Sequence, residues 1–82
     1  MSEETALSAR EIEIYIPLLN EGVDVLRPTT GILLEPDVVR VVATQDYNPE
    51  VEEWEFPPGS TVRYVKARRG GRELLVARQR VA

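Results

Sequence analysis

The stretch "EIEIYIPLL", residues 11–19, alternates isoleucine with glutamate or tyrosine. Ile12, Ile14 and Ile16 therefore share one face of an extended chain, and the more polar side chains share the other. This period of two is typical of a β-strand that is buried on one face. Pro17 has no backbone N–H, so we expect regular strand pairing to end there, or the strand to lie at an edge or bulge.

Four further segments have the length and composition of strands and lack helical spacing. They are VDVLRP (23–28), VVRVVATQ (38–45), STVRYVKA (60–67) and ELLVARQRV (73–81). The sequence TTG at 29–31 is expected to break the first of them before ILL resumes it, and EPD at 35–37 predicts a turn. Gly70-Gly71 suits a two-residue hairpin turn between the last two segments.

Five short strands joined mostly by tight turns predict an all-β protein. We expect residues 10–82 to form a single small five-stranded SH3-like barrel, because closing the sheet removes edges that would promote aggregation. An OB-like barrel is the structural alternative, although its strands are usually longer. A chain of 82 residues has room for one modest core and not for a second domain. Residues 1–9 are polar and are expected to form a flexible tail.

The segment YNPEVEEWEFPPGS, residues 47–60, predicts one short helical turn near 49–54. Asn48 is a favoured N-cap, and the proline after it suits the first position of a helix. A spacing of three places Val51 and Trp54 on the same side of such a turn. The Pro-Pro-Gly sequence that follows is expected to end it.

The same segment holds the only Trp and the only Phe of the chain, Trp54 and Phe56, among four glutamates. We predict that both rings mainly plug an open end of the barrel, since burying a large apolar side chain contributes roughly 2–3 kcal/mol. The alternative is a partly exposed Trp54 that anchors a basic partner, because Trp is over-represented at interface hot spots.

Cys and His are both absent from the chain. Most nucleophile–base pairs, general bases near neutral pH and zinc or copper ligands depend on these residues, so we predict no enzymatic activity and no cofactor. The acids between residues 46 and 55 lack the glycine and spacing of a calcium-binding loop, so no metal site is predicted. The lack of Cys, the acidic start and the lack of an apolar run of about 20 residues predict a cytoplasmic protein that does not enter a membrane.

The net charge of −4 conceals an uneven distribution. Residues 1–59 carry three arginines and thirteen acids, a net charge of −10, whereas residues 60–82 carry seven basic residues and one acid, a net charge of +6. A basic terminal segment of this kind often binds nucleic acid. The simpler interpretation is that the basic end packs beside the acidic part, so that the two neutralise each other.

These patterns predict a non-catalytic protein-interaction module that binds a protein partner or a second copy of itself through segment 47–56. The residues predicted to contact that partner are Tyr47, Glu52, Glu53, Trp54 and Phe56. The alternative is an RNA- or DNA-binding barrel that uses the basic hairpin. Its predicted contact residues are Arg63, Lys66, Arg68, Arg69 and Arg72. We favour a protein partner because the chain as a whole is acidic and would repel phosphates.

Two stretches, IYIPLLNEGVDVLRP (14–28) and YNPEVEEWEFPPGSTV (47–62), resemble a pattern found in small, largely uncharacterised bacterial proteins of similar size. The pattern can be written IYxPLLxEGxxVxRP followed by YxPxxExWxFPPGxxV. This resemblance implies a compact, stand-alone β-rich domain and implies no activity. More distantly, PPGSTV followed by the basic strand, GG and ELLVA resembles the later strands of SH3-like barrels.

Overall fold

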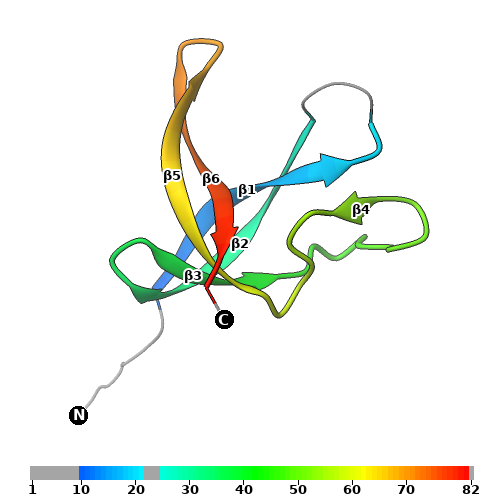
Figure 1. Cartoon of the computed structure of the whole chain (residues 1–82), viewed down its shortest axis with the longest axis horizontal. Helices are drawn as coiled ribbons and strands as arrows, with labels where there is room; N and C mark the ends of the chain where they lie inside the picture. Colours follow the sequence, from blue (N-terminus) through cyan, green and yellow to red (C-terminus); the bar gives the residue numbers. More distant parts are fainter. Residues whose placement is uncertain (1–9, 22–24, 82) are drawn as a thin grey trace.

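A computed structural model describes residues 10–21 and 25–81, and this part of the chain consists of strands and turns without a helix. The strands are β1 (Arg10–Leu19), β2 (Leu26–Glu35), β3 (Val38–Val42), β4 (Glu53–Trp54), β5 (Thr61–Arg69) and β6 (Arg72–Arg80). Figure 1 shows their arrangement. The prediction of an all-β protein is confirmed. The flexible tail predicted at 1–9 lies outside the described residues.

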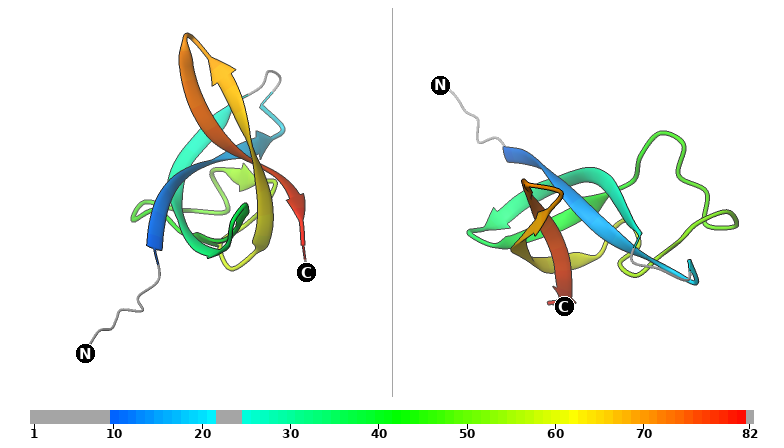
Figure 2. Two further views of the ribbon diagram at one scale, coloured as in Figure 1. Left: turned by 90° about the vertical axis from the view of Figure 1, so that its left-hand side faces the viewer. Right: turned by 90° about the horizontal axis from the view of Figure 1, so that it is seen from above.

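Five of the six strands form a ring. β1–β2, β2–β3, β3–β5 and β5–β6 pair antiparallel, and a parallel bridge between Tyr15 of β1 and Val76 of β6 closes the circle. In Figure 2 (left) these strands curve around a common centre. β4 is the strand that the sequence did not predict, and it pairs with the end of β1 through Leu18↔Trp54 and Leu19↔Glu53.

The prediction that residues 29–31 break a strand is wrong, because β2 continues through them. Gly31 pairs with Ile12 of β1 and with Val41 of β3, so β2 has a partner on both edges at this point. A β-carbon on Gly31 would lie 3.0 Å from the Val39 side chain, so only glycine allows this close approach. Pairing on both edges therefore outweighs the local turn preference of the sequence.

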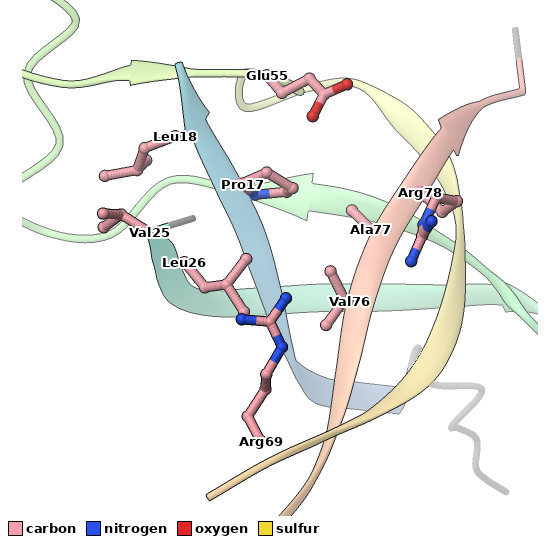
Figure 3. Close-up of a pocket in the computed structure, with 9 residues that line it drawn as sticks. All are labelled: Pro17, Leu18, Val25, Leu26, Glu55, Arg69, Val76, Ala77 and Arg78. Atoms are coloured by element: carbon pink, nitrogen blue, oxygen red, sulfur yellow. The ribbon is translucent and has the colours of Figure 1, made fainter. Parts of the chain in front are cut away.

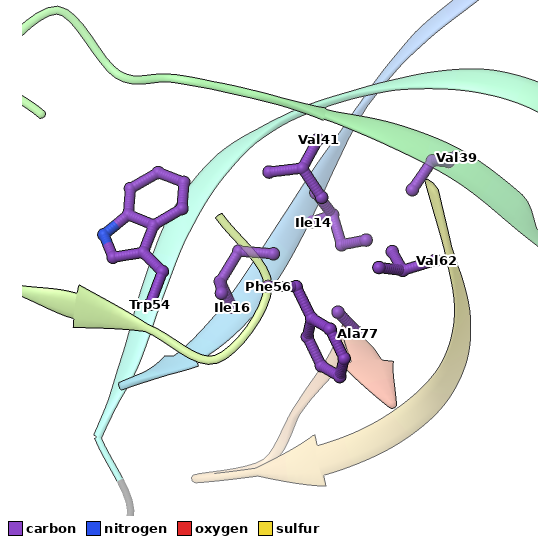
Figure 4. Packing of buried hydrophobic residues seen from close by; sticks show 8 residues of the cluster. All are labelled: Ile14, Ile16, Val39, Val41, Trp54, Phe56, Val62 and Ala77. Carbon is purple, nitrogen blue, oxygen red and sulfur yellow. The ribbon is translucent and has the colours of Figure 1, made fainter. Parts of the chain in front are cut away.

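The core fills the centre of the ring and contains two of the three residues predicted to face inward from β1, Ile14 and Ile16, while Ile12 is partly buried and packs against it. Its buried residues are Ile14, Ile16, Val39, Val41, Trp54, Phe56, Val62 and Ala77. Figure 4 shows the two aromatic rings entering this cluster of branched aliphatic side chains. Trp54 is 3% exposed and Phe56 is 6% exposed, so the prediction that both rings belong mainly to the core is confirmed.

The short helix predicted near 49–54 does not form, because the chain makes a single turn at residues 49–51 and is then extended. Asn48 does cap a turn, since its Oδ1 accepts from Glu50 N at 2.9 Å and its carbonyl oxygen accepts from Val51 N and Glu52 N. The chain then becomes extended, because the next residues pair with the free edge of β1 as β4. As a result Val51, which helical spacing would turn inward with Trp54, is 74% exposed.

The hairpin between β5 and β6 forms as predicted. Gly70 and Gly71 both have positive φ, 59° and 81°, as a type I′ turn requires. β5 pairs with β3 only over residues 61–63, and β6 meets β1 only at Val76. The end of the hairpin therefore extends beyond the ring as a two-stranded ribbon, which is seen at the top of Figure 1.

Candidate functional site

The aromatic residues proposed as partner contacts have structural roles. Trp54 and Phe56 are buried in the core, and Tyr47 is half-buried. The Tyr47 ring meets the Trp54 ring edge to face, with centroids 4.7 Å apart and an interplanar angle of 68°. This arrangement stabilises the start of the segment and leaves little aromatic surface for a partner.

Glu52 was predicted to contact a partner, but its carboxylate is held within the protein. Arg27 Nε donates to Glu52 Oε1 at 3.0 Å, and a second guanidinium nitrogen contacts the other carboxylate oxygen. Trp54 Nε1 donates to the same Oε1 at 3.2 Å. Glu52 therefore ties segment 47–56 to β2 and satisfies the buried indole. The arginine hydrogen bonds hold the pKa of Glu52 below its ordinary value and raise the pKa of Arg27.

This network predicts an acid-dependent loss of stability. Because the pKa of Glu52 is lower in the folded chain than in the unfolded chain, protonation favours unfolding. The ionised Glu52 contributes fully to the unfolding free energy above about pH 4.5, because 4.5 is the ordinary pKa from which its pKa is lowered. This contribution disappears as the pH falls through the folded-state pKa. We expect Glu52→Gln and Arg27→Gln to reduce the pH dependence of the unfolding free energy below about pH 4.5.

Urea denaturation at a series of acidic pH values measures this dependence. Arg40→Gln is the matched control, because Arg40 is exposed on β3 and forms no ion pair with the described residues. It should keep the wild-type pH dependence. Wild-type behaviour of both Glu52→Gln and Arg27→Gln would mean that the ion pair contributes nothing in solution.

The exposed part of the segment differs from the predicted one. Val51 is 74% exposed and Leu19 is 37% exposed, and both border the same shallow depression of about 230 Å³. Glu53 also lies there, where its Oε1 accepts from Asn20 Nδ2 at 2.6 Å. We name this region the acidic loop surface. It consists of Leu19, Glu21, Pro49, Glu50, Val51 and Glu53.

Sequence reasoning found Glu53 in this surface and missed its apolar members. Helical spacing predicts Val51 on the same side as the buried Trp54, and no pattern in the sequence marks Leu19 as part of a surface. Only the pairing of β4 with β1 brings these two residues to one depression. No local pattern indicates that pairing, because β4 has only two residues.

The cations proposed for nucleic-acid binding do not share one face. Arg63 is paired with Asp37 at 2.9 Å, in the only ion pair of the described residues that joins the acidic and basic parts of the chain. Lys66 and Arg68 lie on one face of the ribbon. Arg69 and Arg72 are opposite each other on the other face, according to the strand register.

The two parts of the chain therefore neutralise each other only locally. The remaining ribbon cations, Lys66, Arg68, Arg69 and Arg72, are exposed. Arg68 Nη1 donates to the Gly71 carbonyl oxygen at 3.3 Å, which orients it along the hairpin turn. The simple interpretation that the basic end packs beside the acids holds for Arg63 and not for the end of the ribbon.

The fold and these surfaces define a small all-β domain. Comparisons with known protein families, curated proteins and solved structures gave no match to this chain. Within residues 10–21 and 25–81, acids do not gather in a group of three or more that could hold a metal ion. The same residues contain no membrane-spanning helix.

Proposed function

We propose that this protein is a non-catalytic interaction module whose acidic loop surface binds a basic protein partner. The observation that carries the proposal is the 74% exposure of Val51 in a segment whose two large aromatic side chains are buried. A β-branched aliphatic side chain that is 74% exposed on a loop contributes little to the core, whereas it can be buried against a partner.

The surroundings of Val51 indicate the chemistry of that partner. Glu50 and Glu53 are exposed beside it, and Glu21 and Leu19 border the same depression. Acids around a small apolar centre resemble the polar rim and apolar core of an interface. The net charge of −10 on residues 1–59 would steer a cationic surface toward this region and raise its association rate.

The anchoring of the segment supports the same proposal. The Arg27–Glu52 pair and the Tyr47–Trp54 contact hold the base of the loop on the ring. The loop therefore presents Val51 from a fixed support, which reduces the entropy lost on binding.

Affinity capture tests this function. The immobilised full chain is incubated with nuclease-treated extract of the native cells, and the captured proteins are compared with those of two double variants. We expect the Glu50→Lys/Glu53→Lys variant to capture about tenfold less of the partner than the wild type, or still less. The control, Glu11→Lys/Glu13→Lys, makes the same charge change at two exposed acids of β1 and should keep it.

Val51→Asp extends the test to the apolar centre, because burying an added carboxylate without a partner is costly. Val51 has few native contacts, so this variant should remain folded by circular dichroism. Equal capture by the wild type and by all the variants would overturn the assignment of the surface.

The basic ribbon favours nucleic-acid binding as a second candidate. Lys66, Arg68, Arg69 and Arg72 extend beyond the ring, where a two-stranded ribbon can contact phosphates. Their division between two faces and the overall charge of −4 weaken this candidate relative to the first. Partners that are captured without nuclease and lost with it would favour the ribbon.

We also propose that the ring belongs to the small SH3-like barrels. Its support is a set of five curved strands that close on themselves, four of them nine or ten residues long, with a long hairpin between β5 and β6. The closing contact is a single parallel bridge, so the barrel would be open on the side where β1 and β6 separate.

A further inference from the structure

Pro17 marks the point at which β1 and β6 separate. Leu18 N donates to the Val25 carbonyl oxygen at 2.9 Å, so the N–H of Leu18 is directed toward β2. Successive residues of a strand direct their N–H groups to opposite edges, so Pro17 lacks the donor that would face β6. The parallel pairing consequently stops at Tyr15↔Val76.

A pocket of about 320 Å³ lies beyond this point, between β6 and the ends of β1 and β2 (Figure 3). Its apolar lining consists of Pro17, Leu18, Val25, Leu26, Val76 and Ala77. Pockets that hold small molecules have volumes of about 300–1,000 Å³, so this one suits a small ligand. It shares no residue with the acidic loop surface.

The charged residues of the pocket are arranged unevenly. Arg69 lies in the β5–β6 ribbon and Arg78 lies further along β6, and in Figure 3 the Arg69 guanidinium points toward Leu26 and Val76. Glu55 lies near Pro17 at another part of the rim. Neither arginine takes part in an ion pair with the described residues.

The strand register explains why both arginines reach this pocket. Arg69 alternates with Ala67 and Val65 along β5, which places it on the ribbon face of Val76. Arg63 pairs with Gln79 and Tyr64 pairs with Ala77, so Arg78 is the extra residue of a β-bulge. Bulges commonly redirect a side chain at functional sites.

We propose that this pocket binds a small aliphatic carboxylate. Its carboxylate lies between the Arg69 and Arg78 guanidinium groups, each of which can donate paired hydrogen bonds to a carboxylate. The alkyl chain covers the apolar side chains of β1 and β2. Residues 60–82, which supply both arginines, have a net charge of +6 and attract the anion, whereas Glu55 repels it from its own part of the rim.

Octanoate is the probe, and two related compounds separate the contributions of charge and chain. Titration of the ¹⁵N-labelled full chain, followed by NMR, should shift the amides of Leu18, Leu26, Val76 and Ala77 in a saturable way, with a dissociation constant of roughly 1 mM. Octylammonium has the same number of carbon atoms and the opposite charge, and acetate has the carboxylate with only a methyl group in place of the chain. We expect each of these two compounds to bind at least about tenfold more weakly than octanoate.

Three single variants test the charged residues. Arg78→Gln and Arg69→Gln should each weaken octanoate binding by about tenfold, and Glu55→Gln should strengthen it severalfold. The matched control is Arg80→Gln, which removes an exposed arginine from the same strand outside the pocket and should bind like the wild type. These changes affect exposed side chains, and the NMR spectrum reports whether each variant is folded.

The proposal is overturned if octylammonium binds as tightly as octanoate, or if Arg78→Gln and Arg80→Gln behave alike. Shifts confined to residues away from the pocket would also overturn it. The octanoate titration can fail while the affinity capture succeeds, and the reverse is also possible. The reason is that the titration uses small molecules and its variants leave the acidic loop surface unchanged.

Discussion

Replacing Trp54 with Ala is expected to lower the free energy of unfolding by about 3–5 kcal/mol, the range found when a large buried aromatic is truncated. The indole is 3% exposed and packs in the cluster that contains Ile16 and Val41. Its removal leaves a cavity in a small core that cannot easily collapse. It also removes the donor to Glu52 and the edge-to-face contact with Tyr47. This loss is a large fraction of the total stability of a small domain.

Chemical denaturation measures this effect, and two further variants apportion it. Trp54→Phe keeps an aromatic ring against Tyr47 and loses the hydrogen bond to Glu52, so we expect an intermediate loss. Val51→Ala lies three residues away at a position that is 74% exposed and should change the unfolding free energy by less than about 0.5 kcal/mol. A Trp54→Ala midpoint as close to wild type as that of Val51→Ala would show that the ring is not part of the core.

Replacing Gly31 with Ala is expected to destabilise the protein by about 1–3 kcal/mol through overpacking. The new methyl group would lie 3.0 Å from Val39 Cβ and Cγ2, and 3.2 Å from Ile14 Cγ2. These neighbours belong to strands that pair with β2 on both edges, so the ring cannot widen at one point alone. Without this crowding, Gly→Ala would stabilise by about 0.4–1 kcal/mol through the unfolded state, so the sign of the change is informative.

A double-mutant cycle with Val39→Ala tests the cause. Val39→Ala alone should destabilise because it removes buried side-chain atoms. The two changes together should cost less than the sum of the single ones, since Val39→Ala removes the Cγ2 contact with the new methyl group, although the Cβ contact remains. Thr30→Ala, at the neighbouring position of β2, is the control and should change stability by about 1 kcal/mol or less. Additivity between Gly31→Ala and Val39→Ala would contradict a clash between the new methyl group and Val39 Cγ2.

Local patterns predicted much of the fold because they express properties of single strands and turns. Alternation placed Ile14 and Ile16 in the core, EPD marked the turn before β3, and Gly70-Gly71 formed the hairpin turn. The burial of the only Trp and Phe also followed from the sequence, because a small core needs its largest apolar side chains.

The candidate site was predicted less well, since it depends on contacts between distant residues. Glu53 was correctly expected on the surface, whereas Glu52 is held by Arg27, twenty-five positions earlier in the chain. Val51 is exposed because β4 pairs with β1 in place of a helix. Nothing within the segment itself distinguishes these outcomes, because its capping signals are satisfied by a single turn.

The all-β class of the described residues, the inward-facing residues Ile14 and Ile16 of β1 and the position of the final hairpin turn could be predicted from the amino-acid sequence. Those features depend on side-chain alternation and backbone preferences over a few residues. The tertiary structure alone decided that β2 runs unbroken through Gly31 and that β1 and β6 separate at Pro17 to form the pocket. Both depend on which edges of a strand find a partner, and ring closure determines this between residues far apart in the chain.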